Sequence, residues 1–335
     1  MKSVCFAVLL VPALGLGAFA SNAEDVDRAY RSNVENSSTA MSSHEPNPGG
    51  NHTPEDSMAA EIERGFLRIK EGQVHYRSHG DIRGGGRPLV LIHASPSSSV
   101  NLIPLMESLA GSQPLYAPDT LGNGDSCKMS MAQPEMTDYA DTVRRQIEVL
   151  GHKQVDVYGT HTGGGVAMEL AINYPQLVRR VIIDGIGLYQ PEEVRDMLAN
   201  YAPEVKPDAF GSQFNWAWHY VRDQQLFFPW YKRDAEHQRM KGMASPERLH
   251  ASAMEVLKSL TTYHLAYGAA FRHPKAQRLP LITQETMMIY TADDPLTVYK
   301  DEALGLVKRL VPGEVPKNAT EADKARIIKA FLAKP

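Results

Sequence analysis

The stretch Asp156–Pro175, DVYGTHTGGGVAMELAINYP, decides how the rest of the chain is interpreted. Its apolar start predicts a buried strand, its glycine-rich centre predicts a sharp turn, and its last part has the apolar spacing of a helix. In a strained turn of this kind, the residues two before and two after the apex must be small. Gly159 and Gly163 meet this requirement when His161 is the apex.

The alternative register places Thr162 at the apex, with Thr160 and Gly164 as its flanking residues. A threonine two residues before the apex is bulky for that position, because a branched side chain stands where the turn needs space. The sequence therefore predicts a histidine, and no hydroxyl, at the apex of this turn.

Length and charge set broad limits on the function. The chain has 335 residues, 43% of them hydrophobic, which is enough for one large α/β domain with an insertion. Its formal net charge is −4, and its lysines and arginines are scattered along the sequence. This pattern argues against a nucleic-acid partner and favours a small-molecule substrate. No metal-ligand cluster or dinucleotide-binding motif is evident, so no cofactor is expected.

The N-terminus has the layout of a secretory signal peptide, with an apolar segment that ends at AFA, residues 18–20. We therefore predict a signal peptide over residues 1–20 and a secreted or periplasmic protein. Residues 21–63 are polar and poor in aromatic side chains, which predicts a flexible leader. No later stretch is apolar and long enough to span a membrane, and Cys127 is the single cysteine of the predicted mature chain.

Strand and helix patterns alternate over residues 64–189 and return over residues 281–335. Continuous apolar runs such as LVLI, residues 89–92, are typical of parallel strands that are covered on both faces. We therefore predict an α/β core with a mostly parallel sheet and flanking helices. Residues 190–280 are helical and aromatic in character, and their inserted position predicts a helical cap over a cleft.

Four motifs in this order resemble the α/β-hydrolase superfamily, in particular its cap-containing members such as epoxide hydrolases and haloalkane dehalogenases. LIHASPSSS resembles the oxyanion loop, YAPDTLGNGDS resembles the loop after the next strand, YGTHTGGG resembles the nucleophile elbow, and YTADDPLT resembles the segment with the triad acid. The resemblance implies an α/β-hydrolase fold that covers nearly all of the chain after the leader.

The chain departs from the family pattern at two positions. His161 occupies the position of the nucleophile, and the segment that carries the catalytic histidine in the family contains none, with Val315 or a neighbour in that position. Standard catalysis by a serine nucleophile is therefore not expected. A neutral imidazole can instead act as a general base near neutral pH.

The resemblance implies roles for further residues. Asp294 is the expected acid that orients His161, with Asp293 and Asp119 as alternatives. The backbone N–H groups of Ala94 and Thr162 are the expected oxyanion donors. The expected pocket residues are His93, which is also expected to be a structural hydrogen-bonding residue, Asp119, Trp216, Trp218 and His219.

Three functions stay open at this point. The first is cofactor-independent hydrolysis of a small, largely apolar ester or lactone, with His161 as the base. The second is a lyase or a cofactor-free oxygenase that uses the same base on a substrate proton. The third is a ligand-binding protein without turnover.

Overall fold

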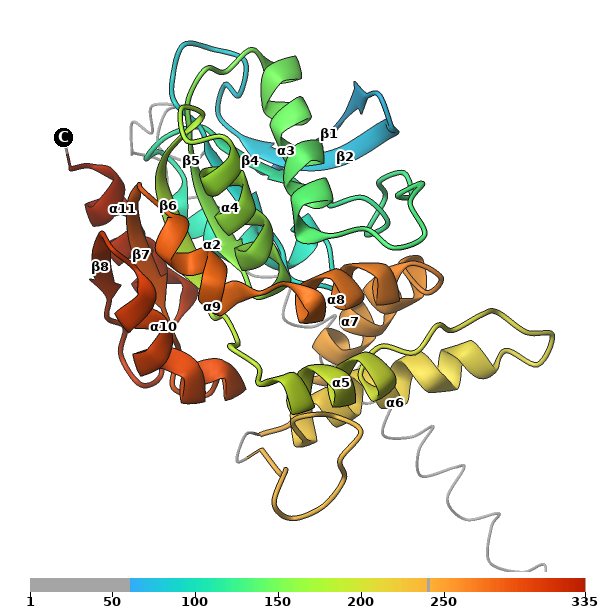
Figure 1. Ribbon diagram of the computed structural model, residues 1–335. Coiled ribbons are helices and arrows are strands. Elements are labelled where there is room, and N and C mark those ends of the chain that lie inside the picture. Colours follow the sequence, from blue (N-terminus) through green and yellow to red (C-terminus); the bar gives the residue numbers. More distant parts are fainter. Residues whose placement is uncertain (1–60, 240–241, 335) are drawn as a thin grey trace, which may run out of the picture. The chain divides into compact units, whose positions relative to one another are not determined.

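The computed structural model describes residues 61–239 and 242–334, all of them in the compact unit Met58–Pro335 (Figure 1). The predicted signal peptide and the predicted leader up to residue 60 lie outside the described residues. In the described part of the chain, no helix combines the length and the apolar character needed to cross a membrane.

An eight-stranded sheet lies at the centre of the described residues, with the spatial order β1-β2-β4-β3-β5-β6-β7-β8. The strands are β1 (Glu63–Ile69), β2 (Gly72–His79), β3 (Leu89–Ile92), β4 (Leu115–Pro118), β5 (Val155–Thr160), β6 (Val178–Asp184), β7 (Glu285–Ile289) and β8 (Leu310–Gly313). Strands β1 and β2 form an antiparallel hairpin, and β2 pairs antiparallel with β4. The other neighbours are parallel, which confirms the predicted fold class.

Helices cover both faces of the sheet (Figure 1). The helices of the described residues are α2 (Ile103–Leu109), α3 (Met136–Leu150), α4 (Thr162–Asn173), α5 (Pro191–Asn200), α6 (Ser212–Leu226), α7 (Pro246–Lys258), α8 (Tyr263–Arg272), α9 (Lys275–Arg278), α10 (Lys300–Leu306) and α11 (Glu321–Leu332). Short 3₁₀ turns complete the list: η2 (Ser99–Leu102), η3 (Leu279–Leu281) and η4 (Pro295–Tyr299).

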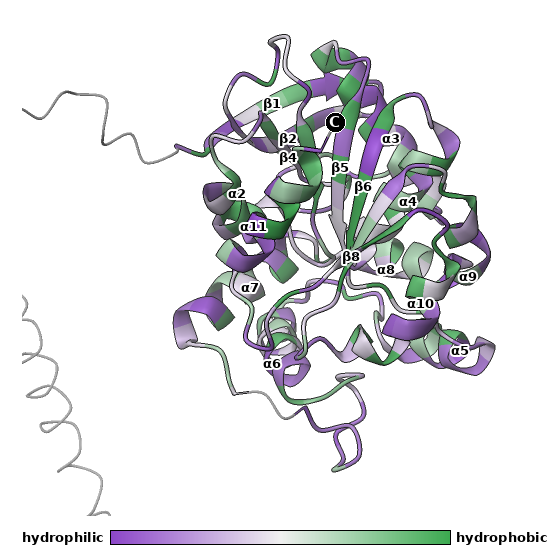
Figure 2. Ribbon diagram, turned by 90° about the vertical axis from the view of Figure 1, so that its left-hand side faces the viewer, coloured by the Kyte–Doolittle hydropathy of each residue, from purple (hydrophilic) through white to green (hydrophobic). Residues whose placement is uncertain are grey.

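Alternate residues of the central strands point to different helices, as the pleat of a strand requires. In β3, Val90 and Ile92 pack with α3 and α4, whereas Leu89 and Leu91 pack with α2 and α11. All four side chains are fully buried. In Figure 2, strand β6 is mostly hydrophobic and the helices around the sheet carry both hydrophobic and hydrophilic stretches. Two hydrophobic cores on opposite faces therefore stabilise the sheet. The loops follow the ends of its strands.

Residues 190–280, predicted as a cap, contain α5 to α9 and have an aromatic cluster of their own. Helix α6 packs against α7, and α5 packs against α8. In the centre of this cluster, Tyr220 lies 4.9 Å from the ring of Trp216 in a stacked arrangement and 5.0 Å from that of Trp230. Most of the aromatic residues in this segment therefore stabilise the helices by packing on each other.

A buried ionic group joins the end of this segment to helix α4. The carboxylate of Glu169 accepts hydrogen bonds from Arg278 at 2.7 and 2.6 Å, and it lies 2.7 Å from Nε2 of His273. Burial opposes the charge of Glu169, but the hydrogen bonds from His273 and Arg278 outweigh it and lower the pKa of the carboxyl to about 2. This group fixes α9 against the helix that begins at the predicted apex.

Candidate active site

His161 lies between β5 and α4 in a strained backbone conformation. Its φ of 49° and ψ of −108° place it in a region that residues with a side chain rarely adopt. Among the described residues it is the one non-glycine with a positive φ. Strain of this kind is typical of functional positions that the surrounding structure holds in place.

The two neighbouring glycines are required because the backbone comes very close to them. A Cβ atom on Gly159 would lie 2.2 Å from the carbonyl oxygen of Gly163, and one on Gly163 would lie 2.3 Å from the carbonyl oxygen of Ile92. No side chain fits at either position. The structure thus places His161 at the apex, as the spacing of the glycines predicts, and it does not support the register with Thr162 at the apex.

The imidazole of His161 pairs with Asp294, which follows strand β7. Nε2 of His161 lies 2.7 Å from Oδ2 of Asp294. The second carboxylate oxygen of Asp294 accepts the N–H of Leu296 at 2.9 Å, so both oxygens are fixed. Because an ionised carboxylate only accepts, Nε2 of a neutral His161 carries the proton. Nδ1 then remains as the basic nitrogen, and it has no hydrogen-bond partner among the described residues.

Of the alternatives for the acid, Asp293 is exposed and Asp119 belongs to another cluster. Burial works against charge on His161, but the negative charge and the hydrogen bond of Asp294 raise the pKa of the imidazole above its usual value. Burial likewise opposes charge on Asp294, and His161 lowers the pKa of that carboxyl. The two groups therefore stabilise each other in their charged forms.

Gly185, directly after β6, provides the space in which the pair meets. Its φ is +72°, and a Cβ atom there would lie 2.6 Å from Oδ2 of Asp294 and 2.7 Å from Cδ2 of His161. These distances are shorter than any real contact of a methyl group. The absence of a side chain at residue 185 is thus a condition for the hydrogen bond between His161 and Asp294.

The pair opens into a cavity of about 560 Å³, a size that accommodates a small organic molecule. The His161 side chain is 44% exposed there, whereas that of Asp294 is 7% exposed. The aromatic side chains of the cavity come from the predicted cap and the segment before it: Tyr189, Tyr201, Phe227, Phe228, Tyr267 and Phe271. Its charged and amide side chains include Gln224, Gln225, Arg239, Lys275 and Lys324.

The two predicted oxyanion donors differ in their positions. Thr162 begins α4 and lines the cavity, and an N–H at the first helical position has no partner inside its own helix. Ala94 does not line the cavity; the next residue, Ser95, does. The ring of His93 holds the carbonyl of Ala94 at 2.7 Å, so the loop presents Ser95 instead. The N–H of Ser95 donates to Oγ1 of Thr162 at 3.2 Å.

His93 and Asp119 do not line the large cavity, which corrects the prediction that both are pocket residues. Nε2 of His93 accepts the N–H of Thr120 at 2.9 Å, so its Nδ1 carries the proton that is donated to Ala94. Both nitrogens are in use, and burial lowers the pKa of His93. His93 is therefore a structural hydrogen-bonding residue, which is the second role that the sequence predicts for it.

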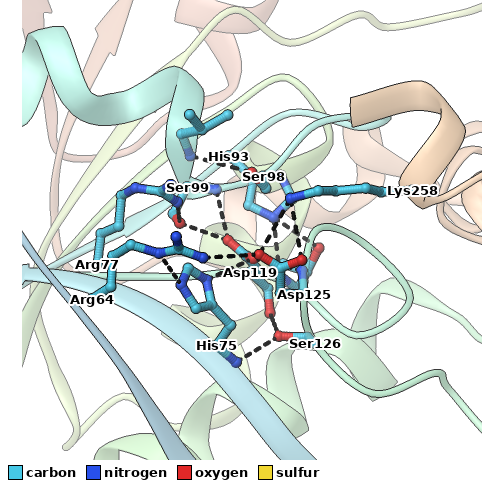
Figure 3. Close-up of polar contacts among 12 residues, drawn as sticks. Arg64, His75, Arg77, His93, Ser98, Ser99, Asp119, Asp125, Ser126 and Lys258 are labelled. Atoms are coloured by element: carbon cyan, nitrogen blue, oxygen red, sulfur yellow. Dashed lines mark hydrogen bonds and ion pairs between the residues drawn. The ribbon is translucent and has the colours of Figure 1, made fainter. Parts of the chain in front are cut away.

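Asp119 belongs to the loop YAPDTLGNGDS and lies in a polar cluster (Figure 3). Its carboxylate accepts from Nδ1 of His75 at 2.9 Å, from the N–H of Ser99 at 2.8 Å and from the N–H of Asp125 at 3.0 Å. Although oxygen and nitrogen atoms of His75, Asp119 and Asp125 come within 4.8 Å of one another, they are already used by protein donors. Arg64 also donates to His75 and to Asp125, so the cluster does not suit a cation.

Trp216, Trp218 and His219 are not pocket residues either. All three lie in the middle of α6, where Trp216 packs in the aromatic cluster and Trp218 and His219 are exposed. The cavity is reached by residues at the end of the same helix and just after it, from Gln224 to Phe228. The sequence pattern identified the helix but could not show which turn of it faces the cavity.

Two lysines of the cavity were not found from the sequence. Lys324 of α11 pairs with Asp184 at 2.8 Å, and Lys275 of α9 is buried. Val315, which the sequence placed in the slot of the missing histidine, packs against the core formed with α2 and α11; from the same loop, Ala319 reaches the cavity. Neither lysine belongs to a motif, so no signal in the sequence distinguishes it from the other lysines.

Comparison with known proteins gives a consistent result. Residues 87–315 match the family model described as alpha/beta hydrolase fold. A 2-hydroxymuconate semialdehyde hydrolase from Pseudomonas sp. is 36% identical over 105 residues, which are 30% of this chain and 37% of that protein. A soluble epoxide hydrolase from Corynebacterium sp. is 37% identical over 108 residues, 32% of this chain and 37% of that protein. The matched segments therefore span little more than a third of the length of these curated relatives.

Among solved structures, an epoxide hydrolase from an endophytic Streptomyces superposes with a TM-score of 0.61. The match covers 81% of this chain and 95% of that chain at 16% sequence identity. At this level of identity the likeness shows the fold and nothing finer.

Proposed function

Because the chain belongs to the α/β-hydrolase fold family, we propose that it is a hydrolase in which His161 acts as a general base without a cofactor. Its substrate is a small molecule with a largely apolar body and an ester or lactone carbonyl. The single observation that carries this proposal is the 2.7 Å contact between Nε2 of His161 and Asp294, which leaves Nδ1 available at a cavity. The hydrolase names of two relatives agree with it.

In this proposal, Nδ1 of His161 removes a proton from a water molecule as that water attacks the carbonyl carbon. The charge of Asp294 stabilises the imidazolium that forms. The N–H of Thr162 stabilises the oxyanion, a contribution of about 3 kcal/mol for one such donor. The imidazolium then returns the proton to the leaving oxygen as the C–O bond breaks, so His161 ends neutral.

The test is a pH–rate profile on aryl esters and lactones for the wild type and for His161→Gln. In the wild type, kcat/KM is expected to rise with pH through a pKa above the ordinary value of histidine, because Asp294 raises it. Loss of the base is expected to lower kcat/KM by about 10²–10⁴-fold and to abolish this limb of the profile. His219→Gln is the matched control, since that histidine is exposed and outside the cavity.

Equal rates for the wild type and His161→Gln would reject His161 as the base. Hydrolysis in ¹⁸O-labelled water separates the proposed reaction from the lyase and oxygenase alternatives. Hydrolysis places one water oxygen in the acid product, whereas abstraction of a substrate proton followed by elimination does not.

We also propose that the enzyme is exported. The proposal rests on the apolar segment and the AFA sequence of residues 1–20, which are typical of a signal peptide. Sequencing the N-terminus of the protein recovered outside the cytoplasm tests it: a start at residue 21 or 24 supports cleavage, and an intact Met1 contradicts it.

A further inference from the structure

Lys275 is a buried cation at the wall of the same cavity that His161 lines. It is the first residue of α9, and it is only 7% exposed. Lysine is almost never buried to this degree unless an anion pairs with it, because an ammonium group loses much of its solvation inside a protein. The contacts of this ammonium group therefore show whether an anion inside the protein compensates its charge.

In the described part of the chain, no carboxylate forms an ion pair with Lys275. Among the described residues, its ammonium group donates one hydrogen bond, to the carbonyl oxygen of Ala270 in the last turn of α8. That carbonyl lacks its usual helical donor, because the residue four positions later is Pro274, which has no N–H. The ammonium also lies 5.5 Å from the centre of the Tyr189 ring, a cation–π contact. Two of its three N–H donors thus have no acceptor in residues 61–239 and 242–334.

The other lysine of the cavity, Lys324, has a side chain that is 14% exposed and is paired with carboxylates. Nζ of Lys324 lies 2.8 Å from Asp184 and 3.5 Å from Glu321, so two carboxylates compensate its charge. For Lys275, burial is the cause that shifts the pKa, and it lowers the pKa of the ammonium to about 8. At neutral pH the group is still mostly protonated, and Lys275 lines the cavity without an acid among the described residues to compensate its charge.

We propose that Lys275 binds a carboxylate group of the substrate, which makes the substrate a small monoanion with its hydrolysable carbonyl at the other end. The inference rests on the proposed function for the reaction, but the binding site itself does not depend on turnover. A single positive charge with two donors left matches the charge and the two oxygens of one carboxylate. Tyr189, Tyr267 and Phe271 supply apolar surface for the body of such a molecule.

The purely structural alternative is that Lys275 serves only to cap the end of α8 through Ala270. Lysine side chains near the end of a helix commonly bond the last carbonyls. A cap of this kind changes the free energy of unfolding when it is removed, but it gives the cavity no preference for anions. Ligand affinity therefore distinguishes the two roles, and stability alone does not.

The experiment measures the affinity of phenylacetate and of its neutral analogue phenylacetamide by calorimetric titration. Neither probe has an ester to hydrolyse. We expect the wild type to bind phenylacetate at least about tenfold more tightly, since both partners of the hydrogen bond are then charged, whereas phenylacetamide offers a neutral acceptor. Lys275→Met is expected to remove this preference, and Lys128→Met is expected to keep it, because Lys128 is an exposed lysine outside the cavity.

Lys275→Gln covers the case in which the methionine variant does not fold, because its amide N–H can still donate to the carbonyl of Ala270. Lys275→Arg keeps the charge and is expected to retain the preference for phenylacetate. Equal affinity of the wild type for both probes overturns the proposal, and so does a preference that survives in Lys275→Gln.

The same titrations with His161→Gln separate this inference from the proposed reaction. A preference for phenylacetate that is kept in His161→Gln shows that the anion site does not need the base. If the wild type has this preference but hydrolyses no ester, the anion site is supported and the proposed hydrolase is rejected. Hydrolysis that depends on His161, without a preference for phenylacetate, supports the proposed hydrolase and rejects the anion site.

Discussion

Two histidine–aspartate pairs in this molecule have similar lengths and opposite surroundings. His75 and Asp119 lie 2.9 Å apart with side chains that are 0% and 1% exposed (Figure 3). His161 and Asp294 lie 2.7 Å apart, and the imidazole is 44% exposed to the cavity. A short contact between an imidazole and a carboxylate therefore does not by itself make a base.

The second nitrogen of each imidazole accounts for the difference. Nε2 of His75 accepts a hydrogen bond from Arg64 at 3.1 Å, so both of its nitrogens are in use inside the protein. Asp119 is held in turn by several backbone and side-chain donors. Despite its burial, the hydrogen bonds from His75, from Ser99 and from the N–H of Asp125 lower the pKa of its carboxyl. The first pair is therefore a structural brace, whereas the second has a nitrogen that a substrate or a water molecule can reach.

Apart from the loss of His161 itself, Asp294→Asn is expected to give the largest effect on the reaction. The amide can present its NH₂ group to Nε2, which fixes the wrong tautomer and removes the charge that stabilises the imidazolium. We expect kcat/KM to fall by about 10²–10³-fold at the pH optimum. The pH limb is expected to move to lower pH, since Asp294 raises the pKa of His161 and the remaining burial lowers it.

The measurement is the pH–rate profile of the purified variant, with its folding checked by circular dichroism. If the rising limb of the pH–rate profile stays at the same pH and kcat/KM falls by less than tenfold, Asp294 does not set the charge of His161.

Asp119→Asn is expected to affect stability instead. An amide has one acceptor oxygen where the carboxylate has two, so buried donors around residue 119 lose their acceptor, a cost of about 1–3 kcal/mol in the free energy of unfolding. Urea unfolding followed by tryptophan fluorescence measures this cost. The folded fraction is expected to keep a kcat close to that of the wild type. A variant of normal stability with a lost kcat would place Asp119 in the reaction and remove the contrast between the two pairs.

The sequence predicted one of these pairs well and misplaced a member of the other. Glycine spacing alone identified His161, because the backbone approach at Gly159 and Gly163 tolerates no side chain, and such a constraint is visible in a single sequence. Asp294 was recognised from a motif at the end of a strand. Asp119 also follows a strand, however, and only the three-dimensional structure shows that its carboxylate turns towards His75 and away from the cavity.

The cavity wall was harder to predict than the sheet. Strand and helix positions follow from the periods of apolar residues, and both cores confirm them. In residues 190–280, the packing of α5 to α8 on one another decides which side chains reach the cavity. No local sequence pattern specifies this packing. For this reason Trp216, Trp218 and His219 were wrong choices, and Lys275 was missed.

Gly185→Ala tests whether the open pair needs the space beside it. Its added methyl group would lie within 3 Å of both His161 and Asp294, and the residue has a positive φ as well. We expect a loss of about 1–2 kcal/mol in the free energy of unfolding from the backbone strain. In addition, we expect kcat/KM to fall by about tenfold or more, because the two side chains must separate.

Gly111→Ala is the matched control for this variant. Gly111 has a similar φ of +74°, against +72° for Gly185, but a Cβ atom there meets nothing within 4 Å. It is expected to lose similar stability and to keep full activity. Equal activity of the two variants would show that contact between His161 and Asp294 is not needed for turnover.

Asp293→Asn is expected to have the smallest effect and decides which of two adjacent acids belongs to the pair. Asp293 is exposed, and the contact between Arg239 and this residue at 3.0 Å uses its backbone oxygen, which the substitution leaves unchanged. Asp293 lines the cavity, but the carboxylate that contacts His161 is that of Asp294, so we expect kcat/KM within about twofold of the wild type. The measurement is the pH–rate profile beside that of Asp294→Asn. If Asp293→Asn moved the limb and Asp294→Asn did not, the acid that charges His161 in solution would be Asp293, and the 2.7 Å contact of Asp294 would be a second structural brace.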